Sequence, residues 1–137
     1  MLVKPYAPTA DAVTMGSHLR QAFGADYVAI GPSFYKGAFN SGGSSGVQVF
    51  TEPAPPNPNS YNAALGSPGL PLYLLDLRDA PAGPVGQWLE GPYVFHKVSE
   101  VYFTNNPGYD DVTVALGTYF DVVLHVQMIT PSHPFPA

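Results

Sequence analysis

The stretch MGSHLRQAFGADYVAIGPSFYKGAFN, residues 15–40, contains the signals of a helix, a helix stop, a buried strand and a glycine-rich aromatic loop. Over about residues 11–23, apolar side chains recur at the spacing of one helical face, namely Met15, Leu19, Ala22 and Phe23. Gly24 stands where a left-handed residue commonly ends a helix. The near-continuous apolar run 27–31 predicts a strand covered on both faces. A helix, a tight turn and a buried strand in this order favour an α/β fold.

The segments on either side extend this pattern. Residues 1–10 and 52–59 are rich in proline and are expected to be extended. Periodicity and turn residues predict strands at 47–51 (an edge strand), at 72–78, within 93–103 and at 121–131. They predict short helices at 60–66, 84–91 and 111–120, and Ser60 is expected to cap the first of these. We therefore expect an α/β layered sheet with flanking short helices, resembling the C-terminal part of a larger α/β domain.

The last predicted strand alternates in polarity. One face is entirely apolar and consists of Val122, Leu124, Val126 and Met128. The other is mostly polar and consists of Asp121, Val123, His125 and Gln127. A strand with one wet or functional face is the simplest account of this alternation.

Charged residues are scarce. They make up 11% of the 137 residues, whereas about 25% is usual, and 16 prolines and 14 glycines take part of their place. This length predicts one domain. Two interpretations of the low charge remain open: a loop-rich neutral surface, or a surface that more protein covers.

Several classes of function are excluded by composition. The formal net charge is −5 and the five basic residues do not cluster, so nucleic acid and anionic membranes are not expected partners. Cysteine is absent, which excludes disulfides and cysteine-ligated metals. No apolar run is long enough for a signal peptide or a membrane span, so we expect a soluble, cytoplasmic protein.

One short motif could mark a nucleophile. The segment GGSSG, residues 42–46, fits G-x-S-x-G with Ser44 as the serine, and His125 or His133 follows later. That motif requires a strand just before the serine and a helix just after it. Here a loop is predicted before Ser44 and a strand after it, so we interpret the match as accidental.

Pairs of possible metal ligands are placed on predicted strands. His96 and Glu100, like Asp121 and His125, are four residues apart. Four strand residues span about 13 Å, so neither pair could chelate one ion. We expect both histidines to be solvated, and we expect no metal and no cofactor.

Two further clusters allow a ligand or a purely structural role. Asp76, Arg78 and Asp79 end an apolar strand, where α/β sheets place ligands, although Arg78 could simply pair with a neighbouring carboxylate. The aromatic loop 32–40 could form an apolar pocket wall from Phe34, Tyr35 and Phe39, with Gly37 allowing close approach. Packing within the fold would account for the same aromatic residues.

Four segments together carry a family resemblance: MGSHLRQAFGADYVAIGPSFYKGAFN, SYNAALG, LYLLDLR and FDVVLHVQMITP. Between Met15 and Pro131 the chain resembles the C-terminal part of the erythromycin esterase-like family. The Met-Gly helix followed by YVAIG is the most specific part of this resemblance. It implies that residues 1–137 are the C-terminal segment of such a domain, and that the complete enzyme hydrolyses a small ester or a macrolide lactone, with antibiotic resistance as a role.

The resemblance also implies where catalysis takes place. The family's site is metal-independent and uses histidines and acidic residues of the N-terminal half, together with a W-x-H-N-x-H-like strand just upstream of the Met-Gly helix. None of these has a counterpart here, so no catalytic residue can be assigned, and the chain is expected to be inactive without the N-terminal part of the domain. It would contribute a substrate-binding wall formed by Ser33, Phe34, Gly37 and Phe39.

Two other functions remain as alternatives. The chain could be a non-catalytic binding or assembly module that uses its uncharged apolar surface. It could also be an independent serine hydrolase that uses Ser44.

Overall fold

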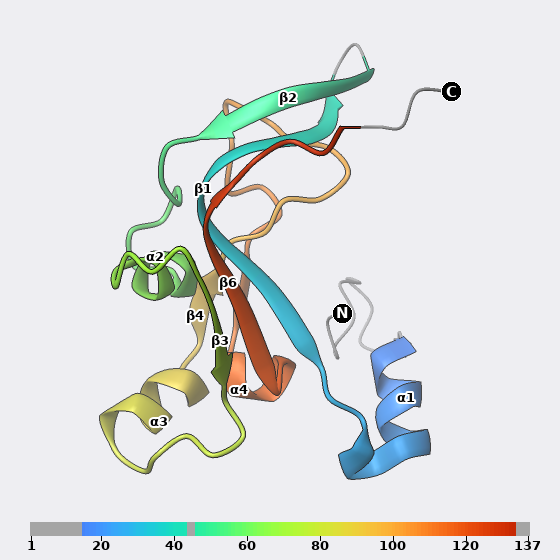
Figure 1. The fold of residues 1–137 in the computed structure, drawn as a ribbon, viewed down its shortest axis with the longest axis vertical. Helices are drawn as coiled ribbons and strands as arrows, with labels where there is room; N and C mark the ends of the chain where they lie inside the picture. The colour runs from blue at the N-terminus through green and yellow to red at the C-terminus, as the bar shows by residue number, and fades with distance from the viewer. Residues whose placement is uncertain (1–14, 44–45, 134–137) are drawn as a thin grey trace.

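A four-stranded mixed sheet forms the centre of this α/β fold (Figure 1). The computed structural model describes residues 15–43 and 46–133. Its strands are ordered β2-β1-β6-β3, and β1 and β6 are parallel while the other neighbours are antiparallel. The strands of this sheet are β1 Ile30–Gly43, β2 Gly46–Glu52, β3 Leu72–Asp76 and β6 Val122–Ile129. The prediction of a layered α/β sheet with short helices is confirmed.

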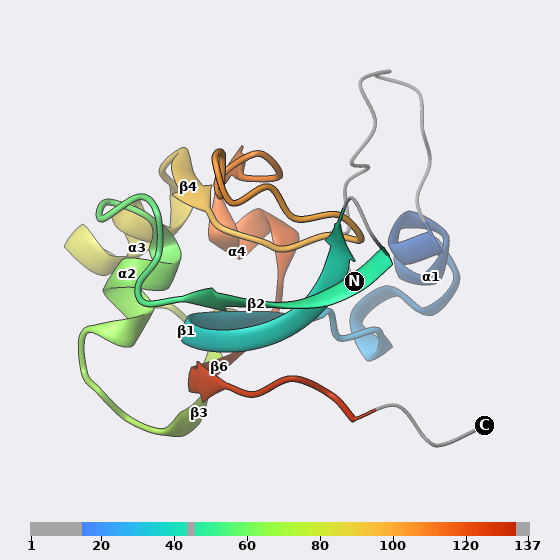
Figure 2. The same ribbon diagram turned by 90° about the horizontal axis from the view of Figure 1, so that it is seen from above.

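Short helices and a two-stranded sheet complete the described fold. The helical elements are α1 Met15–Phe23, the 3-10 turn η1 Gly24–Asp26, α2 Tyr61–Gly66, α3 Pro84–Glu90 and α4 Leu116–Tyr119. The small sheet pairs β4 Tyr93–Phe95 with β5 Val112–Val114. Figure 2 shows α2, α3, α4 and β4 on one side of the large sheet. The hydrophobic core lies on that side, with Tyr61, Leu65, Leu89, Leu116, Phe120 and Val123 among its buried residues.

The sequence predicted most elements correctly. Helices α2 and α3, strand β3, the edge strand β2 and the final strand all lie within a few residues of their predicted positions. The Ser60 side chain accepts a hydrogen bond from the Ala63 N–H and caps α2, as predicted. Gly24 has a φ of 54° directly after α1, which is the expected left-handed helix stop. The predictions for residues 1–14 lie outside the described residues.

The aromatic segment 32–40 is not a loop, contrary to the prediction. It is the middle of the 14-residue strand β1. Pro32 is tolerated there because β2 pairs with β1 only from Gly37 onward, so that within the described part of the chain one edge of β1 has no strand beside it at Pro32. Gly37 has a φ of 131°, and a Cβ atom there would lie 2.1 Å from the Ile129 carbonyl oxygen. The strand can therefore pass close to β6 only because residue 37 is glycine.

Two other elements differ from their predictions. Residues 112–114, expected in a helix, form strand β5, and only Leu116–Tyr119 are helical. The Val-Thr-Val run favours a strand because β-branched side chains are restricted in helices. The run 27–31, predicted as a strand covered on both faces, enters β1 only at Ile30, and Ile30 is half exposed.

The final strand buries the opposite face from the one predicted. Val123 and His125 are fully buried, whereas Met128 is 63% exposed. Leu74 of β3 lies directly opposite Leu124 of β6, so these two side chains share a face with Leu72 and Met128. We call these four residues, Leu72, Leu74, Leu124 and Met128, the open sheet face. Leu72 and Leu74 are exposed in the same way, so this side of the sheet presents apolar side chains to solvent.

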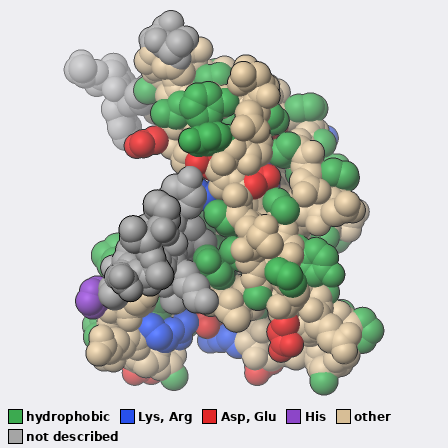
Figure 3. All heavy atoms as spheres, turned by 180° about the vertical axis from the view of Figure 1, so that it is seen from behind, with side chains coloured by type: hydrophobic (Ala, Val, Ile, Leu, Met, Phe, Trp, Pro, Cys, Tyr) green, Lys and Arg blue, Asp and Glu red, His purple; other side chains and the backbone are tan. Residues whose placement is uncertain are grey.

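Helix α1 also exposes apolar side chains. Met15 and Phe23, from its predicted apolar stripe, are each about 60% exposed, and Gly16 is the one residue of the helix that is buried. Arg20 ties the helix to the sheet through a 2.5 Å ion pair with Asp121, which precedes β6. Figure 3 shows the far side of the molecule, where charged side chains are sparse among hydrophobic and uncharged ones. No helix in the described part of the chain is long and apolar enough to cross a membrane.

Candidate functional site

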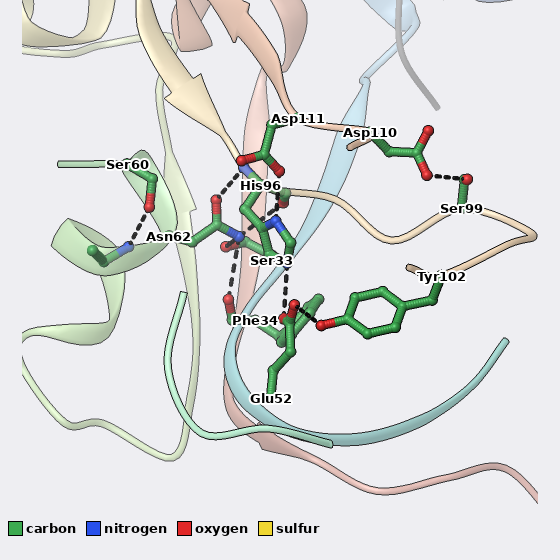
Figure 4. A network of polar contacts seen from close by, with 11 residues as sticks. Ser33, Phe34, Glu52, Ser60, Asn62, His96, Ser99, Tyr102, Asp110 and Asp111 are labelled. Atoms are coloured by element: carbon green, nitrogen blue, oxygen red, sulfur yellow. Dashed lines mark hydrogen bonds and ion pairs between the residues drawn. The ribbon is translucent and has the colours of Figure 1, made fainter. Parts of the chain in front are cut away.

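A buried polar cluster joins β1, β2, α2 and the segments beside β4 and β5 (Figure 4). Ser33 of β1 meets Asn62 of α2 there, and His96 directly follows β4. Sequence reasoning singled out Ser33 and Phe34 but missed Glu52, Asn62 and Asp111. Pairs that are far apart in sequence leave no periodic signal, so nothing in the local pattern indicated them.

His96 lies between two carboxylates. Its Nε2 is 2.8 Å from Glu52 Oε2, and its Nδ1 is 2.5 Å from Asp111 Oδ1. Burial opposes a charge on the ring, but the hydrogen bonds to Asp111 and Glu52 outweigh it and raise the pKa of His96 to about 9. The ring is therefore an imidazolium at neutral pH. The prediction that His96 is a solvated strand histidine is wrong, because its side chain is fully buried.

This cluster does not form a metal centre. His, Glu and Asp are ligand types, yet the two carboxylates contact opposite nitrogens of one ring, so a single ion could not contact all three side chains. Within residues 15–43 and 46–133, no group of three or more potential ligands could hold a metal ion. His96 contacts Glu52 and Asp111 rather than Glu100, the residue four positions away.

Asn62 connects the cluster to the sheet. Its Oδ1 accepts the His96 backbone N–H at 2.8 Å. Its Nδ2 lies 3.0 Å from the His96 carbonyl, 3.2 Å from the Phe34 carbonyl and 3.3 Å from Ser33 Oγ. Helix α2 can approach β1 this closely because Gly66 packs directly against the Tyr35 ring, where a Cβ atom would lie 2.1 Å from the ring.

Ser33 forms a second buried pair with His125. Its Oγ is 3.2 Å from His125 Nδ1 across the β1–β6 ladder. Burial lowers the pKa of His125, and Gln127 partly opposes this, which favours the neutral ring. His125 Nε2 is buried and has no hydrogen-bond partner of good geometry among the described residues. The predicted solvated state of His125 is therefore also wrong, and the serine–histidine pair is enclosed by the sheet and α2.

Ser33 and Phe34 line a small cavity. Its volume is about 240 Å³, and it is lined by Pro32, Ser33, Phe34, His96, Lys97, Val98, Val126 and Ile129. Val126 lies on the same face of β6 as Leu124 and Met128, so the cavity adjoins the open sheet face. The structure thus brings two of the four predicted wall residues to one cavity.

The other two predicted wall residues, Gly37 and Phe39, do not line it. Gly37 allows β1 to approach Ile129. Phe39 is buried in an aromatic cluster, where its ring centroid lies 6.1 Å from Phe34, 6.3 Å from Phe50 and 5.0 Å from Tyr102. Phe39 therefore packs beside the Phe34 ring, and Gly37 allows the close contact between β1 and β6.

The remaining sequence candidates have structural roles or lie outside the site. Arg78 forms a bidentate ion pair with Asp76, which confirms the alternative that Arg78 pairs with a neighbouring carboxylate. The motif 42–46 falls at the β1–β2 connection, where a strand follows instead of the helix that a nucleophile motif requires. Ser44 itself lies outside the described residues.

Comparison with known proteins identifies similar chains. A Bacillus cereus protein of solved structure matches with 30% identity and a TM-score of 0.75, over 89% of this chain and 30% of its own. The structure of a succinoglycan biosynthesis protein matches with 24% identity and a TM-score of 0.72, over 86% of this chain and 28% of its own. The chain therefore spans about 30% of the length of these structures. No curated protein matches the sequence. A family model described as erythromycin esterase matches residues 4–129.

Proposed function

Because this chain belongs to the erythromycin esterase family, we propose that it supplies one part of an ester-hydrolysing domain and is inactive alone. In this proposal the rest of a family domain covers the open sheet face. The complete protein then hydrolyses a small ester or a macrolide lactone. The matched structures, which are about three times as long, support the proposal.

The observation that carries this proposal is the apolar exposure of the sheet. Leu72, Leu74 and Met128 are each more than 60% exposed on adjacent strands. Contiguous exposed apolar side chains of this kind are typical of surfaces that other protein covers. The exposed stripe of α1 and the scarcity of charge agree with the same interpretation.

We assign the substrate-facing wall to β1. Ser33 and Phe34 line the 240 Å³ cavity. Phe39 packs beside the Phe34 ring, and Gly37 lets β1 approach β6 closely. Val126 of the same cavity lies next to the open sheet face. A segment of the rest of the domain that covers this face would therefore close the cavity and add side chains to its lining. The apolar part of the lining, which consists of Pro32, Phe34, Val98, Val126 and Ile129, suits the acyl or ring carbons of an ester.

The two buried histidines are poor candidates for a catalytic base. A general base must be unprotonated and must reach the attacking water. His96 is protonated at neutral pH, and both of its nitrogens are already occupied by carboxylates. His125 is neutral but enclosed, with its Nδ1 occupied by Ser33. Catalytic groups would therefore come from the rest of the domain.

Hydrolysis measured on two proteins tests the proposal. The chain alone should hydrolyse neither p-nitrophenyl acetate nor a macrolide lactone above background. A fusion of this chain to the remaining part of a catalytically active family member should hydrolyse one of them. In the fusion, Phe34→Ala should raise KM, whereas Val85→Ala, which shortens an exposed side chain on α3, should leave KM unchanged. Activity of the chain alone, or a fusion with unaltered KM after Phe34→Ala, would contradict the proposal.

The open sheet face also supports the alternative of a non-catalytic assembly module. A second copy of the chain could cover Leu72, Leu74 and Met128 as well as the rest of a domain could. Light scattering, thermal melting and dye binding together separate the two proposals. A defined dimer that melts cooperatively supports the module, whereas a chain that binds hydrophobic dyes and associates without a fixed size supports the incomplete hydrolase.

A further inference from the structure

A second cavity, of about 500 Å³, lies between β2 and the loop 101–105. It is separate from the cavity beside Ser33, and the two share no lining residue. Its lining side chains include three aromatic rings and three uncharged polar groups: Phe50, Tyr102, Phe103, Gln48, Thr104 and Asn105. Among the described residues, no charged side chain lines it. Its volume is within the range of small-molecule sites, roughly 300–1,000 Å³.

The wall of this cavity is held in place by the buried cluster. Tyr102 donates its hydroxyl hydrogen to Glu52 Oε1 at 2.7 Å, and the other oxygen of Glu52 contacts His96. The backbone is fixed as well: the Tyr102 N–H donates to the Gly42 carbonyl at 3.1 Å, and the Gly42 N–H donates to the Glu100 carbonyl at 2.7 Å. The Tyr102 ring is therefore positioned before any ligand arrives, which reduces the entropic cost of binding.

The lining chemistry selects a class of ligand. An aromatic face carries partial negative charge and attracts the C–H edges of an aliphatic ring. The side-chain amides of Gln48 and Asn105 and the hydroxyl of Thr104 both donate and accept hydrogen bonds, as sugar hydroxyls do. A charged ligand would find no counter-charge in the cavity, and a purely apolar ligand would leave the amides unpaired. We propose that this cavity, between Phe50, Tyr102 and Phe103, binds a neutral saccharide.

This binding does not depend on hydrolysis, so it can be measured on the chain alone. Saturation-transfer NMR with the 137-residue chain would use cellobiose and methyl β-D-glucopyranoside as probes, with irradiation of aromatic protons. Both sugars should show saturable transfer to their ring C–H protons, because those protons contact aromatic faces. Glucuronate and glucosamine, which have similar shapes but carry charge, should show weaker transfer.

Two variants locate the binding. Phe103 is 41% exposed, so Phe103→Ala should leave the core intact and weaken cellobiose binding by about three-fold or more, as expected for one lost aromatic contact. Phe23→Ala removes an exposed ring elsewhere and should leave binding unchanged. Absence of saturable transfer, equal transfer to the charged sugars, or equal affinity of Phe103→Ala and the unchanged chain would each overturn the proposal.

Discussion

At the scale of single residues, the polar interior depends on the charge of His96. Its two carboxylate partners come from Glu52, 44 positions earlier, and Asp111, 15 positions later. The sequence indicated neither pairing, because hydrophobic periodicity reports which side a residue faces and not which distant residue it meets. For the same reason His96 and His125 were expected in solvent. The Arg78 pair was predictable because its partner lies only two residues away.

The raised pKa of His96 predicts that stability falls with pH. Folding holds a proton that the unfolded chain releases above its ordinary pKa of 6.5, so the contribution is complete below pH 6.5 and is lost as pH rises through about 9. The shift corresponds to roughly 3 kcal/mol. Urea unfolding between pH 6.5 and 9 should therefore show a decreasing free energy of unfolding. His125 acts in the other direction, because its lowered pKa reduces stability as pH falls below 6.5.

Two variants separate this effect from other titrations. Glu52→Gln removes one of the charges that hold the proton on His96 and should flatten the decrease. His18→Gln changes an exposed histidine on α1 and should leave it unchanged. A free energy of unfolding that stays constant from pH 6.5 to 9, or the same slope in Glu52→Gln as in the unchanged chain, would contradict the assignment.

At the scale of elements, local signals predicted what local chemistry determines. The Ser60 cap and the Gly24 stop each act within one helical turn, and each was located correctly. The length of β1 was not predictable in this way. Its continuation through residues 32–40 depends on pairing with β6, which is about 90 positions away. The proline and glycines that favoured a loop are accommodated by the missing neighbour at Pro32 and by the close approach at Gly37.

The close approach at Gly37 predicts a costly substitution. Gly37→Ala would place a Cβ atom against the Ile129 carbonyl and also strain a backbone with a φ of 131°. Backbone strain alone costs about 1–3 kcal/mol. Gly69→Ala is the matched control, because Gly69 has a φ of 69° but no atom of residues 15–43 or 46–133 lies within 4 Å of its Cβ position. Urea unfolding should show a clearly larger loss for Gly37→Ala, and equal losses would mean that β1 and β6 separate without cost.

At the scale of the whole molecule, the composition said more than the periodicity did about whether other protein covers the surface. The 11% charged content left open whether the surface is merely neutral or is covered by other protein. The open sheet face and the exposed stripe of α1 favour the second interpretation. The alternation along β6 was recognised correctly, but its faces were assigned the wrong way round within this chain. An apolar strand face indicates a surface that is buried by other protein, but it does not indicate whether that protein belongs to the same chain.

The oxidation rate of Met128 tests most directly whether the rest of a family domain covers the open sheet face. Met128 is 63% exposed, and oxidation of methionine by hydrogen peroxide follows solvent access. Mass spectrometry would compare this rate in the chain alone and in the fusion to the remaining part of an active family member. The account predicts rapid oxidation in the chain alone and a rate slower by about ten-fold or more in the fusion. Equal rates in the two proteins would show that the face stays open and would contradict the account.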